Sequence, residues 1–144
     1  MTLMLLLHLV FAGAWLGCIL VEALFEHGSG GGSDMRLFIS KLHWRVDLFI
    51  EIPAFAGVLL TGGVLVLQTA MTPLLWTKAA FGMIAILFNI ACVWLVRVRL
   101  AHALSGDAGS WERADDWQHK LGAVVLVAML LALAIGAYAG TGTQ

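Results

Sequence analysis

The stretch HWRVDLFIE places three side chains that can exchange protons or bind metal at intervals of four residues: His43, Asp47 and Glu51. In a helix each of them turns by about 40° from the one before it, so all three lie toward one side. Imidazole nitrogens and carboxylate oxygens arranged in this way can relay protons, bind a transition-metal ion or support a cofactor. The stretch leads into a long apolar run, so this chemistry would take place inside a membrane.

The chain as a whole is strongly apolar. It has 144 residues, of which 61% are hydrophobic and 12% charged, and its mean hydropathy is +0.95. Soluble domains have only about 45–50% apolar residues. Four runs, at about 3–26, 45–68, 74–100 and 118–140, are long enough to cross a hydrocarbon core of about 30 Å as helices. We therefore predict an all-α fold, an antiparallel four-helix bundle forming one integral membrane domain over residues 1–144.

Basic residues predict the orientation of the bundle. Seven of the eight Lys and Arg residues belong to one end: Arg36, Lys41, Arg45, Arg97, Arg99, Arg113 and Lys120. By the positive-inside rule this end is cytoplasmic, which places both termini on the non-cytoplasmic side of what we expect to be a bacterial inner membrane. Arg97 and Arg99 are expected to extend to the aqueous boundary.

The connections between the runs carry turn-forming residues. The Gly-rich piece 28–34 is expected to be a flexible linker, and HALSGDAGSWERADD a loop. Pro73 should start the third helix, and Pro53 should kink the second. Trp44, Trp76, Trp111 and Trp117 are expected to be anchors at the membrane boundary.

Helical geometry places the polar residues of the first run on one face. Trp15 and Glu22 follow His8 at offsets of 7 and 14 residues, so they return to within about 40° of its direction. On the third run Lys78 shares a face with Asn89 and Cys92. Ionisable side chains are costly in a bilayer and usually face the interior of a bundle, where they mark a functional site. By depth, His8 and Lys78 belong to the non-cytoplasmic half.

The other ionisable residues gather in the cytoplasmic half, where Glu26 and His27 join Glu22, His43, Asp47, Glu51 and His119. Imidazoles on facing helices, with apolar surroundings and nearby cations, are what a membrane haem requires. In the outer half His8 would be an axial ligand, Trp15 would line the haem and Lys78 would face a propionate. In the inner half His43 and His119 could bracket a second plane, and Glu22, Asp47 and Glu51 would relay protons.

Two other interpretations of these residues remain open. The inner residues Glu22, Glu26, His43, Asp47 and Glu51 could instead hold a transition-metal ion or relay protons to one, although the Glu-x-x-His pair of di-iron bundles is absent. Alternatively, Asp47 and Glu51 could simply pair with Arg45, Arg97 or Arg99, and the polar residues would then serve helix packing.

Three segments of the chain together resemble a known superfamily. They are LHLVFAGAWLG with His8, Trp15 and Gly17, then LFIEIPAFAGVLLTGG, then LLWTKAAFGMIAILF with Lys78. Over about residues 1–105 they are similar to HemJ-type protoporphyrinogen oxidases and CopD-like copper-resistance membrane domains. The resemblance implies a helical bundle that binds haem b, with His8 as the haem-associated histidine and Lys78 as the functional lysine.

The chain also departs from that superfamily. The HemJ pattern has an arginine late in the first helix, where this chain has Glu22 and Glu26, and the Met-rich or Cys-rich ligands expected for copper handling are absent. The resemblance therefore supports the haem rather than a particular substrate.

The sequence thus predicts a membrane protein that binds haem b and takes part in oxidation-reduction or electron transfer. It could be a haem-dependent oxidoreductase with a quinone or a membrane redox partner. Two alternatives are a metal-ion-binding or permeation protein and a small accessory subunit of a larger membrane complex. The expected surroundings are the lipid bilayer, with no nucleic-acid partner. Gly57, Gly122 and Gly136 would allow helices of two copies to approach closely in a homo-oligomer.

Overall fold

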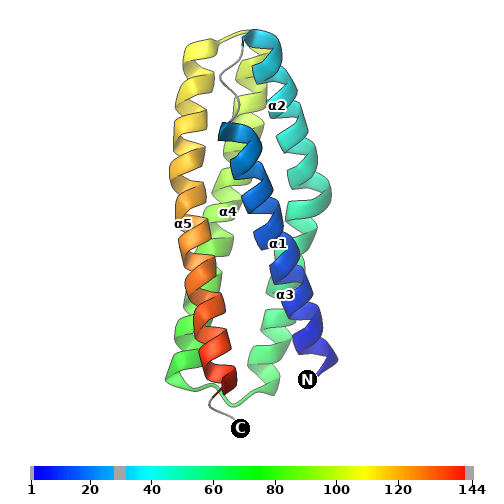
Figure 1. Cartoon of the computed structure of the whole chain (residues 1–144), viewed down its shortest axis with the longest axis vertical. Helices are drawn as coiled ribbons and strands as arrows, with labels where there is room; N and C mark the ends of the chain where they lie inside the picture. The colour runs from blue at the N-terminus through cyan, green and yellow to red at the C-terminus, as the bar shows by residue number, and fades with distance from the viewer. Residues whose placement is uncertain (1, 28–31, 142–144) are drawn as a thin grey trace.

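The chain forms an all-α bundle of four long antiparallel helical spans (Figure 1). The computed structural model describes residues 2–27 and 32–141, without the side chains of residues 25–27 and 141. Its elements are α1 (Leu3–His27), α2 (Ser33–Val46), the π-helix η1 (Asp47–Glu51), α3 (Ile52–Gln68), α4 (Pro73–Ser105) and α5 (Ala108–Thr141). All four spans are long and apolar enough to cross a membrane, which confirms the predicted fold class.

The second span is longer than the sequence predicted. α2, η1 and α3 continue one another from Ser33 to Gln68, whereas the apolar run alone indicated a start near residue 45. The added turns are polar and amphipathic, so a hydropathy criterion misses them. Of the predicted Gly-rich linker, residues 28–31 lie outside the described residues, while Ser33 and Asp34 already belong to α2.

The stretch predicted as a loop between the last two helices is almost entirely helical. α4 runs to Ser105 and α5 begins at Ala108, so only Gly106 and Asp107 separate them. Gly106 has a φ of 74°, the left-handed conformation that commonly ends a helix. Asp107 caps α5 by accepting a hydrogen bond from the Ser110 backbone N–H at 3.0 Å. Hydrogen bonds from the Ser110 hydroxyl and N–H hold the pKa of Asp107 below its usual value.

The helices differ in length, and this difference divides the bundle into two parts. α1 has 25 residues, about 38 Å, whereas the span from α2 through α3 has 36 residues, about 54 Å. We call the end with the α4–α5 turn the basic end, which Figure 1 draws at the top. α1 stops short of this end, so the last part of the bundle consists of α2, α4 and α5 only. We call it the three-helix part. The start of α1 and the end of α5 lie at the opposite end.

Packing joins the helices in a defined order. α4 and α5 pack along each other, α1 packs on α3, and α2 packs on α4. The apolar core lies around Trp15, whose ring centroid is 5.9 Å from that of Phe55, and includes Ala85, Ile86 and Val125. Cys18 and Cys92 are buried free thiols. Pro73 starts α4, as expected.

Close approach of α1 and α3 depends on Gly57. A Cβ at this position would lie 2.5 Å from ring atoms of Phe11, so the ring occupies the space that the glycine leaves. Lys78 covers Gly136 in a similar way, with its Cε 3.0 Å from where a Cβ would be. Two of the three glycines that could serve an oligomer are therefore used inside one chain.

We expect Gly57→Ala to destabilise the bundle by about 1–3 kcal/mol, because the added methyl group overpacks the contact with Phe11. Gly63→Ala on the same helix is the matched control, since a Cβ there meets nothing within 4 Å. Thermal unfolding in detergent measures both. Equal melting temperatures for the two variants would contradict the proposed close approach.

Candidate functional site

The π-helix η1 positions the acidic residues of the site. It covers Asp47–Glu51, immediately before Pro53, and both Asp47 and Glu51 are buried. Proline has no N–H to donate and disturbs the preceding turn, and π turns are a recognised way to absorb such a disturbance. The wider turn keeps residues four apart closer to one line than an α-helix does. Where the sequence predicted a kink at Pro53, the structure has a π turn just before the proline. This turn directs the carboxylates of Asp47 and Glu51 into the bundle.

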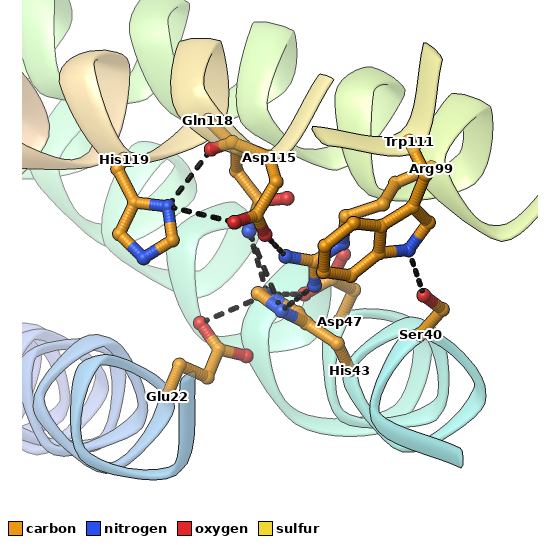
Figure 2. Close-up of polar contacts among 9 residues, drawn as sticks. All are labelled: Glu22, Ser40, His43, Asp47, Arg99, Trp111, Asp115, Gln118 and His119. Carbon is orange, nitrogen blue, oxygen red and sulfur yellow. Dashed lines mark hydrogen bonds and ion pairs between the residues drawn. The ribbon is translucent and has the colours of Figure 1, made fainter. Parts of the chain in front are cut away.

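His43 lies at the centre of these groups (Figure 2). Its Nε2 is 3.4 Å from Glu22 Oε2 on α1 and 3.4 Å from Asp47 Oδ1 on η1. Its Nδ1 is 2.8 Å from Arg99 Nη2 on α4 and 3.3 Å from Gln118 Nε2 on α5. One buried imidazole therefore joins residues from four different segments of the chain.

These contacts determine which nitrogen of His43 carries the proton. A guanidinium N–H can only donate, so His43 Nδ1 accepts the hydrogen bond from Arg99. In the neutral ring the proton is then on Nε2, where it faces the carboxylates of Glu22 and Asp47. His43 thus receives a hydrogen bond on one side and offers a proton to two acids on the other.

Arg99 is the only permanent cation that the described contacts place in this group. It is completely buried, and it also pairs with Asp115 on α5. The sequence predicted that Arg99 would reach the aqueous boundary, and that prediction is wrong. Arg97 is exposed, but Arg99 follows two residues later, about 200° around the helix, and so faces the interior.

Trp111 holds Arg99 in place. The indole is buried, its Nε1 donates to Ser40 Oγ at 2.9 Å, and the Arg99 guanidinium lies 5.6 Å from the ring centroid. The Arg36 guanidinium, at 5.3 Å from the same centroid, also pairs with Glu112 at 2.8 Å. Trp111 was predicted to be an interfacial anchor, but it packs between two arginines inside the three-helix part. Trp76 and Trp117 are exposed, as anchors would be.

We call this set the His43 cluster: Glu22, His43, Asp47, Glu51, Arg99, Asp115 and Gln118. Glu22, Asp47 and Glu51 are all buried, and the ligand atoms of Glu22, His43 and Asp47 lie within 4.8 Å of one another. Asp47 is 0% exposed, and neither of its carboxylate oxygens has a hydrogen-bond partner among the described residues. The side chains of Glu26 and His27, also assigned to this half, lie outside the described residues.

His119 was predicted to form an inner pair with His43, but the described contacts place it differently. Its Nδ1 is 2.8 Å from the backbone oxygen of Asp115, one turn earlier on α5, and the side chain is 40% exposed. Figure 2 shows Asp115 and Gln118 from the same helix beside it. His119 therefore borders the cluster, whereas His43 is its centre.

A second polar group lies in the other half of the bundle. His8 Nδ1 is 3.0 Å from Thr61 Oγ1, and Thr61 Oγ1 is 2.6 Å from the Gly57 carbonyl oxygen. The hydroxyl has one hydrogen, which it donates to that carbonyl, so it accepts from His8 Nδ1–H. The neutral His8 ring then has its unprotonated nitrogen at Nε2, the reverse of His43.

Lys78 belongs to the same region. It is half-buried, lies over Gly136 of α5, and is within electrostatic range of the His8 ring. Among the described residues no carboxylate pairs with it. We call His8, Thr61 and Lys78 the His8 group. Between the two groups lies Trp15, which is 1% exposed.

Sequence reasoning named Arg99 only as a possible partner of Asp47 and Glu51. It did not find Asp115, Gln118, Trp111 or Ser40 as parts of the site. A signal was present, because Trp111, Asp115 and Gln118 are spaced by four and three residues, the pattern of one helical face. It was hidden because HALSGDAGSWERADD, with its Gly, Ser and Asp residues, was taken as a loop.

Comparisons of the chain with protein-family models, curated proteins and solved structures found no match.

We expect Arg99→Gln to cost about 3–5 kcal/mol of stability, because it breaks a buried ion pair and leaves Asp115 without its cation. Arg97→Gln, two residues away and exposed, should change stability by no more than about 0.5 kcal/mol. Denaturant unfolding in detergent measures the difference. If the two variants lost the same stability, Arg99 would not be the charge that holds the cluster together.

Proposed function

We propose that this chain is a haem b-binding integral membrane protein that takes part in oxidation-reduction, with His8 as an axial ligand. The observation that carries the proposal is the hydrogen-bond chain from His8 through Thr61 to the Gly57 carbonyl. A metal-ligating histidine typically donates its other N–H to a fixed acceptor, which sets the tautomer and orients the ring. Thr61 is this acceptor for the Nδ1–H of His8, which leaves Nε2 available as a ligand.

Lys78 supports the same proposal. A lysine inside an apolar bundle is costly unless it meets an anion, and no described carboxylate meets this one. A haem propionate would supply that charge. Gly136 gives the lysine room to lie against α5 and to extend toward the His8 group.

His43 fits ligation less well than His8 does. Its Nε2 bears the proton because Arg99 donates to Nδ1. Ligation through Nε2 would move the ring proton to Nδ1, where it would face the N–H groups of Arg99. We therefore assign proton handling, rather than haem ligation, to the His43 cluster. His119 borders the cluster, and we assign it no more than a part in this proton handling.

Charge balance supports this assignment. Arg99 already pairs with Asp115, so among the described contacts no permanent cation is left to balance Glu22, Asp47 and Glu51. Several unbalanced carboxylates cannot persist in an apolar interior. The His43 Nε2–H lies 3.4 Å from both Glu22 and Asp47, so it could pass a proton to either acid.

The bound haem would supply the electron transfer, and the residues of this chain would hold it and move protons. The residues LHLVFAGAWLG and LLWTKAAFGMIAILF, which resemble HemJ-type and CopD-like proteins, point to the same cofactor. With the basic end on the cytoplasmic side, the His43 cluster would exchange protons with the cytoplasm. A quinone or a membrane partner protein would be the electron acceptor, in a bacterial inner membrane.

An optical spectrum of the purified protein tests the haem. We expect sharp dithionite-reduced bands of a b-type haem, which disappear in His8→Ala because the axial ligand is lost. Thr61→Val should weaken haem binding by about 10- to 100-fold, since it removes the acceptor that orients His8. His102→Ala is the control, because His102 lies on α4 near the α4–α5 turn.

A featureless spectrum from correctly folded protein produced with ample haem would contradict the proposal. Co-purification with a large partner, again without haem, would favour the accessory-subunit alternative. Loss of haem in His102→Ala as well as in His8→Ala would show that the spectrum does not report on the His8 group.

A metal ion at the His43 cluster is the second candidate function. The observation that favours it is the proximity of the Glu22, His43 and Asp47 ligand atoms, all within 4.8 Å of one another. A carboxylate and imidazole donor set suits a transition-metal ion. The proton on His43 Nε2 opposes it, because ligands must be deprotonated.

Equilibrium dialysis against Zn²⁺, followed by metal analysis, distinguishes the two candidates. Because Nε2 is protonated, we expect no stoichiometric metal that depends on Asp47. One ion per chain that is lost in Asp47→Asn and kept in Asp116→Asn would instead establish a metal function. Asp116 is a suitable control, since it is exposed and pairs only with Lys120 among the described contacts, at 2.6 Å.

A further inference from the structure

Two polar side chains at the centre of the bundle have donors with no protein acceptor. Trp15 on α1 is 1% exposed and Asn89 on α4 is 2% exposed. Among the described residues no acceptor lies within hydrogen-bond distance of Trp15 Nε1 or Asn89 Nδ2. Buried donors are rarely left unpaired, because each costs the desolvation energy of the group. Two such donors in one core indicate an acceptor that the described residues do not supply.

Trp15 and Asn89 belong to the same part of the core. Asn89 shares a face of α4 with Ala85 and Cys92, which lie four residues before it and three after it. Both of these residues form one core cluster with Trp15. Asn89 is therefore beside the apolar residues that pack on the indole. The acceptor that satisfies one donor would lie near the other.

The position of these donors is midway between the two polar groups already described. On α1, Trp15 lies seven residues from His8 and seven from Glu22, or about 10 Å along the axis in each direction. Cys18 lies on the path to the His43 cluster, and its thiol donates to Glu22 Oε1 at 3.7 Å. Each gap is about four water hydrogen bonds long, at about 2.8 Å each.

We propose that Trp15 and Asn89 bind ordered water at the centre of the bundle, and that this water connects the His43 cluster with the His8 group as a path for protons. Water suits the site because it accepts from both donors and still has hydrogens to offer along the chain. Trp15 and Asn89 only orient the water. A proton taken up at one end is matched by one released at the other, so no water is consumed.

This inference deepens the proposed function, because a proton path serves oxidation-reduction, but its test does not use the haem. The first measurement is hydrogen–deuterium exchange of the ¹⁵N-labelled indoles in lipid bilayers. We expect the Trp15 indole to exchange faster than that of Trp111, which is buried but bonded to Ser40. Asn89→Leu should slow the exchange of Trp15 by at least about tenfold, because it removes one of the two groups that hold the water.

The control for Asn89→Leu is Ile90→Leu, a neighbouring residue of α4 that is exposed on the apolar surface. It should leave the Trp15 exchange rate unchanged. An indole of Trp15 as protected as that of Trp111, in the unchanged protein, would overturn the water site. The site would also be dry if Asn89→Leu raised the melting temperature without altering Trp15 exchange. That result would mean that the substitution only removed an unsatisfied amide, and it would contradict the proposal.

Proton flux into liposomes tests the path. With a potassium gradient, valinomycin and an entrapped pH dye, we expect the unchanged protein to raise the flux above that of empty liposomes. Trp15→Phe and Asn89→Leu should return it to the empty level, whereas Trp94→Phe, an exposed tryptophan of α4, should not. Rapid Trp15 exchange with no flux would overturn the path. His8→Ala removes the proposed haem ligand but keeps both donors, so unaltered Trp15 exchange in that variant separates this inference from the haem proposal.

Discussion

The hydrogen bond from Arg99 to Nδ1 of His43 is the contact on which the basic half of the bundle depends. Arg99 is fully buried, and such a cation is tolerated only when its donors are satisfied and its charge is balanced. Asp115 balances it from α5, and Trp111 covers it from the same helix. Because Arg99 occupies Nδ1, the proton of His43 is directed toward Glu22 and Asp47. One buried charge thereby determines both the contacts among four segments and the chemistry that the imidazole can perform.

Helix length places this cluster where it is. α1 ends at His27, short of the basic end, while α2, α4 and α5 continue beyond it. Near the end of α1, Glu22 still meets His43, and past that point the three longer helices pack on one another through Trp111 and Ser40. The cluster therefore lies where four helices become three. A buried polar group at such a transition borders the apolar four-helix core on one side and the polar turns of α2, α4 and α5 on the other.

The sequence predicted the parts of the structure that depend on hydrophobicity and angular position. Long apolar runs gave four spans, and helical offsets brought Trp15, Glu22, His43, Asp47 and Glu51 inward, where all five are buried. It failed where polar residues form helix. The stretch around Gly106 looks like a loop, yet a single left-handed glycine and the Asp107 cap are sufficient to turn one helix into the next. Missing this turn concealed Trp111, Asp115 and Gln118, and it also made Arg99 look like a surface residue. The tautomers of the histidines were equally out of reach, because they depend on partners distant in the chain.

His8 and His43 show how the same residue type acquires opposite tautomers in one bundle. Thr61 has a hydroxyl whose hydrogen goes to the Gly57 carbonyl, so it accepts from His8 Nδ1. Arg99 can only donate, so it requires His43 Nδ1 to accept. The first ring therefore has an unprotonated Nε2, as a metal ligand needs, and the second has a protonated Nε2 that faces two acids, as a proton donor needs. Neither tautomer follows from the histidine itself or from its depth in the membrane. Each follows from whether the neighbour on an adjacent helix has a lone pair or a hydrogen to offer.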